Sequence, residues 1–303
     1  MSISVKNISK LYGSQKALDN VSFEVGLGQV VGFLGLNGAG KSTMMKILTC
    51  FIPQTSGTAN VCGFDVNEES IEVRKRIGYL PEHNPLYPEM YVKEYLEFIA
   101  GIYKLKGNIR DRVQEMISLT GLQAEQKKKI GALSKGYRQR IGLAQALIHL
   151  PEVLILDEPT SGLDPNQLVE IRTLIKSIGK EKTVLLSTHI MQEVEAICDR
   201  VIIINKGKII TDESTSVLKI KPQTKEVIII EFEKVIDKTE LLKINGISEV
   251  LNIKENTWSI SGKEKTDIRS VLFKWAVENN QTILSMQKEE QKLEDIFQQL
   301  TGN

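Results

Sequence analysis

A glycine-rich segment, GLNGAGKST, runs from Gly35 to Thr43 and carries residue types that bind phosphate. It follows a continuous apolar run and opens a segment with helical spacing, which is the context that a phosphate-binding loop requires. Its glycines allow backbone N–H groups to turn toward phosphate oxygens, and the helix N-terminus adds partial positive charge. We predict that Lys41 reaches the β- and γ-phosphates, that the Ser42 hydroxyl ligates Mg²⁺, and that Thr43 contacts the α-phosphate. The predicted ATP-binding residues of this segment are Gly35, Asn37, Gly38, Ala39, Gly40, Lys41, Ser42 and Thr43.

Two acids, Asp157 and Glu158, end the apolar run that begins at Val153. A carboxylate in this place can hold the Mg²⁺ shell, which suits Asp157. The second carboxylate, Glu158, can polarise the water that attacks the phosphate. We therefore predict that the bound nucleotide is hydrolysed.

Two further positions allow either a structural or a functional interpretation. His189 follows the apolar run Val184 to Ser187, at the sheet edge where ligands bind, and it can donate to a γ-phosphate. The same place also suits an unrelated surface histidine. Ser134 can cap a helix that starts at Lys135, and with Gly136 it can also face a γ-phosphate held by another subunit. The residues alone leave both questions open.

The composition of the 303-residue chain is that of a globular protein, with 41% apolar and 25% charged residues. A net charge of +1 gives no electrostatic footprint for nucleic acid. No apolar run approaches the ~20 residues that span a bilayer, and the N-terminal segment lacks an apolar signal core. We therefore expect a cytoplasmic chain. The three cysteines, without CxxC spacing, argue against a disulfide framework or a zinc site.

The hydrophobic patterns predict an α/β domain followed by a small second domain. Apolar strands alternate with helical segments at a spacing typical of a parallel sheet covered on both faces. The predicted strands and helices of the first domain are Ser2–Val5, Val21–Val25, Val30–Leu34, Lys41–Phe51, the helical pattern Tyr91–Thr120, Val153–Leu156, Leu168–Ile178, Val184–Ser187, and the hairpin strands Val201–Ile204 and Lys208–Ile210, with a turn at Pro53–Gly57.

A boundary is predicted near Lys221–Thr224. Beyond it the order βαββαβ predicts a ferredoxin-like sandwich, closed by an amphipathic helix at Lys292–Leu300. We see no catalytic constellation in this part. Its predicted elements are Glu226–Phe232, Thr239–Ile244, Glu249–Ile253, Trp258–Ser261, Thr266–Glu278 and Thr282–Met286.

Taken together, these motifs resemble those of the ATP-binding subunits of ABC transporters over residues 1–220. GLNGAGKST resembles the Walker A loop, and VLILDE resembles Walker B with Glu158 as the catalytic glutamate. LSKGY at Leu133–Tyr137 occupies the place of the family signature, SGLD at Ser161–Asp164 that of the D-loop, and His189 that of the switch histidine. Tyr12 stands where the family stacks an aromatic ring on adenine.

The resemblance implies a P-loop NTPase fold of the ABC ATPase type, an α/β domain at 1–220 with a helical subdomain at about 86–150, and an accessory α+β domain at 224–303. It also implies a homodimer in which each ATP lies between Walker A of one copy and the signature of the other. Ser134, Gly136 and Asp164 would then bind ATP across the dimer. The implied cofactors are ATP and Mg²⁺, with Ser42, Glu82 and Asp157 as metal ligands.

Four positions, in three motifs, depart from the family pattern. Glu82 replaces the usual glutamine of the Q-loop and could still contact Mg²⁺ and water, so we count it with the catalytic residues. Lys135 and Tyr137 replace a glycine and a glutamine of the signature. Leu36 replaces a common proline, and we expect little effect because the loop glycines remain.

The narrower resemblance is to the drug- and polysaccharide-exporter-like branch, called ABC-2 type. GYLPEHNPLYPEMYVKEYL, LSKGYRQRIGLAQAL and LLSTHIMQEVEAICDRVIIINKGKI look very like the ATP-binding subunit associated with gliding motility in Bacteroidetes-type bacteria (the GldA type). This resemblance names no transported substrate.

The leading hypothesis is the ATPase subunit of a membrane exporter, bound to an integral membrane permease on the cytoplasmic face of the inner membrane. Membrane contact would run through the permease only, with the loop Glu82–Met90, including His83, Pro85, Leu86 and Tyr87, as the docking surface. The alternative is a soluble ABC ATPase acting on ribosomes or DNA. A single motif set and short intervening helices disfavour it, and a P-loop kinase would have no reason for the signature or for His189.

Overall fold

The computed structural model describes residues 1–220, 227–263 and 267–288. These residues fall into two compact units, one from Met1 to Ser216 and one that begins at Val217. The predicted boundary at Lys221–Thr224 and the predicted final helix at Lys292–Leu300 lie outside the described residues.

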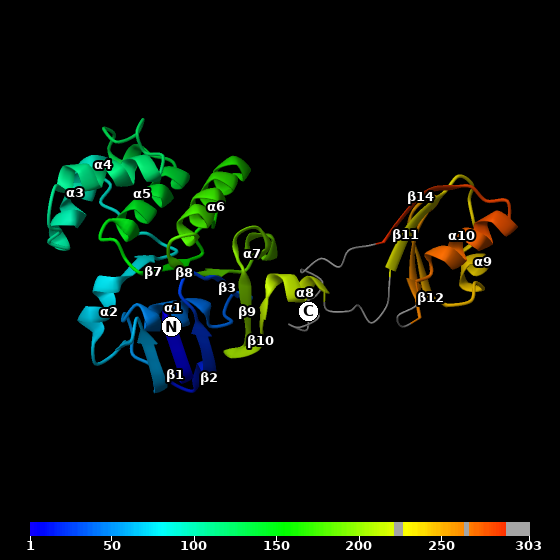
Figure 1. The fold of residues 1–303 in the computed structure, drawn as a ribbon, viewed down its shortest axis with the longest axis horizontal. Helices are drawn as coiled ribbons and strands as arrows, with labels where there is room; N and C mark the ends of the chain where they lie inside the picture. The colour runs from blue at the N-terminus through cyan, green and yellow to red at the C-terminus, as the bar shows by residue number, and fades with distance from the viewer. Residues whose placement is uncertain (221–226, 264–266, 289–303) are drawn as a thin grey trace. The chain divides into compact units, whose positions relative to one another are not determined.

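A six-stranded sheet in the order β10-β9-β3-β8-β7-β6 forms the centre of the first unit (Figure 1). Neighbouring strands are parallel, except for the antiparallel edge pair β9 and β10. Every residue of β3, β7 and β8 is buried, as expected for strands covered on both faces. Because β3, β8 and β7 are parallel neighbours, their carboxyl ends lie side by side. The strands are β3 Val30–Leu34, β6 Ile77–Leu80, β7 Val153–Asp157, β8 Thr183–Thr188, β9 Arg200–Asn205 and β10 Lys208–Ser214.

A second, antiparallel sheet has the order β2-β1-β4-β5 and shares a hydrophobic core with β3 and α1. Its first two strands are longer than the apolar alternation predicted, since pairing continues through polar residues to Tyr12 opposite Gln15. The predicted turn Pro53–Gly57 is partly strand, because Ser56 already pairs with β1. The strands are β1 Ile3–Tyr12, β2 Gln15–Val25, β4 Ser56–Val61 and β5 Phe64–Asp65.

Helices pack on the central sheet, and α3, α4 and α5 lie together as a group (Figure 1). The predicted helix Lys41–Phe51 ends earlier, at Leu48, and Cys50 has a positive φ of 58°. The helical pattern Tyr91–Thr120 is two helices, separated by a segment with Gly107 at φ 94°. The helices are α1 Lys41–Leu48, α2 Ser70–Arg76, α3 Val92–Ile102, α4 Ile109–Leu119, the 3₁₀ turn Ile130–Ala132, α5 Lys135–Leu147, α6 Pro165–Gly179, α7 Met191–Ile197 and α8 Thr215–Ile220.

Helix α5 approaches β6 closely at Gly78. A Cβ atom on Gly78 would lie 2.1 Å from the carbonyl oxygen of Ala146, so a side chain there would force the two elements apart. The loop that follows β6 also lies against α5, where a Cβ on Gly142 would meet the Asn84 side chain.

The second unit is a four-stranded antiparallel sheet in the order β12-β13-β11-β14, with its own hydrophobic core. The chain order βαββαβ and this strand order agree with the predicted ferredoxin-like sandwich. The predicted start of its second helix, at Thr266, lies outside the described residues. The elements are β11 Val227–Phe232, α9 Lys238–Leu242, β12 Ile247–Lys254, β13 Thr257–Gly262, α10 Arg269–Glu278 and β14 Ile283–Lys288.

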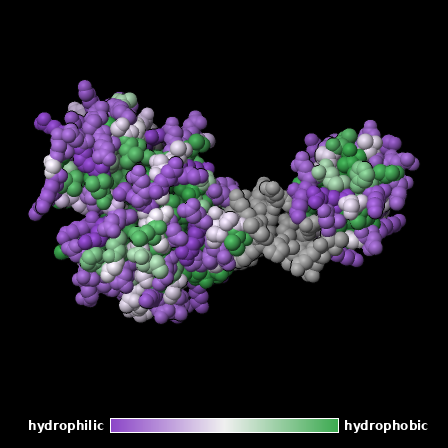
Figure 2. All heavy atoms as spheres, in the orientation of Figure 1, coloured by the Kyte–Doolittle hydropathy of each residue, from purple (hydrophilic) through white to green (hydrophobic). Residues whose placement is uncertain are grey.

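The face of each unit drawn in Figure 2 is largely hydrophilic, with smaller hydrophobic areas between. Of the helices that the structure describes, none combines the length and the apolar character required to cross a bilayer.

Candidate active site

The glycine-rich loop joins β3 to α1 in a conformation that depends on glycine. Gly40 caps α1 in the left-handed region, at φ 110°, and a Cβ there would lie 2.6 Å from the carbonyl oxygen of Ala17. Gly38 also has a positive φ, 80°. The loop ends at the N-terminus of α1, where unpaired N–H groups and the helix dipole favour an anion. The sequence prediction of a strand, loop and helix in this order is confirmed.

A chain of contacts between an ammonium, a carboxylate and an imidazole crosses the site from α1 to the end of β8. Lys41 Nζ donates to the Gly35 carbonyl at 2.8 Å and lies 3.3 Å from Glu158 Oε1. The other oxygen of Glu158 accepts from His189 Nδ1 at 2.9 Å. Lys41 and Glu158 are buried, whereas the His189 ring is partly open to solvent. The structure thus brings together three residues that lie 117 and 31 positions apart in sequence.

A second set of hydrogen bonds holds Asp157. Ser42 Oγ donates to Asp157 Oδ1 at 3.2 Å, and Ser187 Oγ donates to the same oxygen at 2.5 Å. Ser187 Oγ also accepts from the backbone N–H of Glu158. One serine of β8 therefore orients both acids at the end of β7. Sequence reasoning did not single out Ser187, because its place in an apolar run gave no sign of these contacts.

The backbone of Glu158 is itself unusual, with a positive φ of 49°. A non-glycine residue in this region costs on the order of 1–3 kcal/mol, and it persists where surrounding contacts enforce it. Here the Glu158 amide is held by both the carbonyl and the hydroxyl of Ser187. Such strain is typical of functional sites.

Of these residues, Lys41, Ser42, Glu158 and His189 line a cleft of about 540 Å³, whereas Asp157 and Ser187 do not line it. Most of the predicted nucleotide-binding residues lie here, including Tyr12, which is 50% exposed, and so does Glu82, predicted as a catalytic residue and metal ligand. Gln15 and Ala17 of β2 also line the cleft, and no motif pointed to them. The lining residues are Tyr12, Gln15, Ala17, Asn37, Gly38, Gly40, Lys41, Ser42, Thr43, Glu82, Glu158, Ser161 and His189.

The residues present fit a nucleotide with Mg²⁺. The loop offers backbone N–H groups and one buried ammonium to phosphate oxygens, and the exposed aromatic residue Tyr12 also lines the cleft. The Ser42 hydroxyl and the Asp157 carboxylate are oxygen donors of the kind that Mg²⁺ prefers. Gly35 and Ala39 do not line the cleft, but both help to hold the loop in place. The Gly35 carbonyl accepts from Lys41 Nζ, and the Ala39 carbonyl accepts from the Gly207 amide.

Three predicted ATP-binding residues lie apart from this cleft. Ser134 Oγ accepts from the Tyr137 amide, and Asp164 accepts from the Gln167 amide, so both residues cap helices. Gly136 lies against the Gln167 side chain, which a Cβ would meet at 2.3 Å. Within one chain their geometry is structural, and their role toward a second copy stays a prediction.

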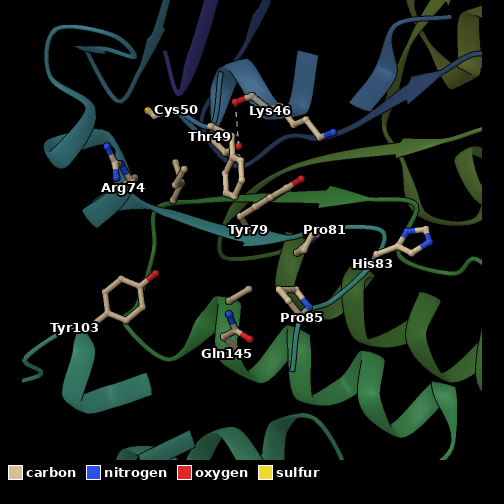
Figure 3. A pocket seen from close by; sticks show the side chains of 13 residues that line it. Lys46, Thr49, Cys50, Arg74, Tyr79, Pro81, His83, Pro85, Tyr103 and Gln145 are labelled. Atoms are coloured by element: carbon tan, nitrogen blue, oxygen red, sulfur yellow. Dashed lines mark hydrogen bonds between the residues drawn. The ribbon is translucent and has the colours of Figure 1, made fainter. Parts of the chain in front are cut away.

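A separate cleft of about 630 Å³ lies between the end of α1, β6 and α5 (Figure 3). Pro81, His83 and Pro85 line it from the loop after β6, and Tyr103 closes the side near α3. Tyr87 of the same loop packs instead against Tyr95 and Phe98. Of the side chains predicted for docking, His83 and Pro85 therefore line this cleft, while Leu86 and Tyr87 do not. The remaining lining residues are Lys46, Thr49, Cys50, Phe51, Arg74, Ile77, Tyr79, Gln145 and Ala146.

Comparison with known proteins identifies the family. The sequence pattern of the ABC transporter family matches residues 18–161. The bacitracin transport ATP-binding protein BcrA of Bacillus licheniformis is 36% identical, over 99% of this chain and 97% of that protein. This chain belongs to the ABC transporter family. A second ABC relative, the linearmycin resistance ATP-binding protein LnrL of Bacillus subtilis, is 32% identical over 99% of this chain and 98% of that protein.

A solved ABC structure shows the same fold. The ATP-binding cassette MJ0796, in a dimeric post-hydrolysis state bound to ADP and Pi, is 28% identical with a TM-score of 0.64 over 70% of this chain and 98% of that one. The first unit is therefore an ABC ATPase cassette of the P-loop NTPase class. As a member of this family, the chain binds ATP and is an ATPase that drives transport.

Proposed function

We propose that two copies of this chain bind Mg²⁺-ATP between them and hydrolyse it to drive a separate membrane permease that exports drug-like molecules. The observation that carries the proposal is the Lys41–Glu158–His189 chain of contacts inside the nucleotide cleft. In this arrangement an ammonium, a carboxylate and an imidazole face the place where a γ-phosphate would lie.

The proposed roles follow from the chemistry of each group. Glu158 accepts a proton from the attacking water, and His189 orients that water and donates to the γ-phosphate. Lys41 balances charge on the β- and γ-phosphates. Mg²⁺, held by Ser42, Asp157 and Glu82, would supply further positive charge to these oxygens. Tyr12 is placed to stack on the base.

The dimer is supported by the solved cassette relative MJ0796, which was solved as a dimer. We propose that Ser134, Gly136 and Asp164 of one copy face the nucleotide of the other. The helix that starts at Lys135 then directs its N-terminal dipole toward the γ-phosphate.

Helix α1 and the loop after β6 each contribute residues to both clefts, and this supports coupling to the permease. Helix α1 carries Lys41 at its start and Lys46 near its end, which lines the second cleft. The loop after β6 places Glu82 in the nucleotide cleft and His83 in the other. We propose that a permease segment fills the second cleft, so that movement around ATP is passed to the membrane protein. The ATPase would lie on the cytoplasmic face of the inner membrane.

The export direction is supported by the names of BcrA and LnrL, which concern bacitracin transport and linearmycin resistance. These names do not concern gliding, so the link to gliding motility stays a prediction from sequence. No relative reported above favours action on ribosomes or DNA.

The substitution Glu158→Gln tests the site. It keeps the shape of the side chain but removes the base, so we expect steady-state ATP hydrolysis to fall by about 10²–10⁴-fold. ATP binding should persist, and an ATP-bound dimer should accumulate in size-exclusion chromatography. Glu181→Gln, at an exposed residue outside the cleft, is the matched control. Turnover near the wild-type rate in Glu158→Gln would exclude Glu158 as the base.

The substitution Phe51→Ser tests docking. Phe51 lines the second cleft with 73% of its surface exposed, so its loss should remove apolar contact with a partner without changing hydrolysis by the isolated chain. We expect the tagged chain to recover a multi-spanning protein from detergent-solubilised native membranes, and Phe51→Ser to lose it. Ile71→Ser, on an equally exposed residue outside the cleft, should retain it. Recovery of ribosomes or DNA-repair proteins in place of a membrane protein would contradict the transporter role.

A further inference from the structure

Glu193, on the short helix α7, is a fully buried carboxylate that the proposed mechanism does not use. Its Oε1 accepts a hydrogen bond from Thr160 Oγ1, and its Oε2 accepts one from Thr188 Oγ1 at 2.6 Å. The Arg172 guanidinium, on α6, lies 3.9 Å from Oε1. A carboxylate is expensive to bury unless it is hydrogen-bonded and has a counter-charge, and this one has both.

The two threonines stand on either side of the Glu158–His189 contact. Thr160 comes two residues after Glu158, and Thr188 comes immediately before His189. The Thr188 hydroxyl also accepts from the Ile190 amide at 3.0 Å, so it fixes the chain on both sides of His189. Through its two threonine contacts, the Glu193 carboxylate therefore joins the segment after β7 to the end of β8.

The backbone of this region needs such support. Glu158 has a positive φ, and Ser187 holds its amide from the preceding side. After Glu158 in the sequence, the first side chain that makes a buried hydrogen bond is that of Thr160, whose hydroxyl donates to Glu193. Glu193 thus completes the support of the strained residue.

We propose that Glu193 is a positioning residue for ATP hydrolysis, which acts through Thr160 and Thr188 to hold Glu158 and His189 in contact. The inference rests on the proposed roles of Glu158 and His189. It differs from a purely structural role in one measurable respect. A structural residue would change stability and leave the turnover of the folded protein unchanged, whereas a positioning residue lowers turnover at saturating ATP.

The first experiment is Glu193→Gln in the full chain. We expect kcat at saturating Mg²⁺-ATP to fall by up to about 10²-fold, because small displacements of reacting groups have effects of this size. The dissociation constant for ATP should stay unchanged, since Glu193 does not line the nucleotide cleft. Glu195→Gln, on an exposed glutamate of the same helix, should keep wild-type kcat.

A hydroxyl series at Thr188 provides a test that does not require a change at Glu193. Thr188→Val has nearly the same shape but cannot donate to Glu193 or accept from Ile190, so kcat should fall. Thr188→Ser retains the hydroxyl and should restore kcat. The double variant Glu193→Gln/Thr188→Val should be no slower than the slower single variant, because both act on one contact.

The outcomes separate this inference from the proposed function. Wild-type kcat in a folded Glu193→Gln protein, or equal kcat in Thr188→Val and Thr188→Ser, would overturn the positioning role. If Glu193→Gln does not fold, as judged by circular dichroism, the Thr188 pair decides. Wild-type turnover in Glu158→Gln would instead remove the proposed function itself.

Discussion

At the scale of single residues, Lys41 and Glu158 form a buried ion pair. Both side chains are less than a tenth exposed, and the nitrogen–oxygen distance is 3.3 Å. Two charges taken out of water stabilise little as a pair, but the removal of one partner leaves the other buried without its counter-charge, and Glu158 would then keep only its contact with His189. The site therefore links nucleotide chemistry to the stability of the folded chain.

From this pair we predict that Lys41→Met loses ATP binding and lowers the free energy of unfolding by about 3–5 kcal/mol. The double variant Lys41→Met/Glu158→Gln should recover part of that loss, because no charge is then left unpaired. Denaturant unfolding without nucleotide measures both effects. Additive losses in the double variant would show that the pair does not contribute as proposed.

At the scale of elements, α5 and β6 are joined through His149, which follows the helix. Its Nε2–H donates to the carbonyl of Ile77, the first residue of β6, at 2.8 Å, and its ring stacks on Tyr103 with centroids 3.9 Å apart. No sequence motif includes His149, and these contacts give it a structural place. Burial lowers the pKa of His149 below its ordinary value, although the bond to Ile77 opposes this shift.

The sign of the pH dependence follows from this lowered pKa. As pH falls through about 6.5, the unfolded chain protonates the histidine while the folded chain keeps it neutral, so stability decreases toward acid. Above that pH the contribution of His149 is fully present. We predict that His149→Phe flattens the decline of unfolding free energy between neutral and mildly acidic pH. Denaturant unfolding at a series of pH values measures the slope, and a slope as steep in His149→Phe as in the wild type would contradict the prediction.

At the scale of the whole molecule, the described residues build separate hydrophobic cores. One joins the antiparallel sheet to α1 and the central sheet, and another lies within the second unit between its sheet and helices. The presence of two separate cores supports the proposal that the two units fold as distinct domains, and the boundary near Lys221–Thr224 stays a prediction.

Separate cores lead us to predict that Ile260→Ala destabilises the second unit alone. Ile260 is fully buried in that core, so its truncation should cost about 2–5 kcal/mol. Differential scanning calorimetry should show more than one transition, with only one shifted to lower temperature and ATP hydrolysis retained. Ile253→Ala, at a residue that is 55% exposed, should shift none. A single transition that moves as a whole would show that the units unfold together.

The sequence by itself determined the local features of this protein: the phosphate-binding loop, the buried strands and the acids at the end of β7. Each is a short pattern with strict spacing, and its physical cause lies within a few residues. The order βαββαβ of the second unit was predictable for the same reason. Strands with polar pairing partners, such as the far half of β1, were missed because apolar alternation does not mark them.

Only the tertiary structure decided which side chains meet. The contact of Ser42 with Asp157 spans 115 positions and that of Thr160 with Glu193 spans 33, and no local pattern encodes either. The roles of Ser187 and Glu193 were invisible because one lies in an apolar run and the other looks like any charged residue on a helix. Parallel strands bring their carboxyl ends to one edge, and this long-range geometry turns separate motifs into a site.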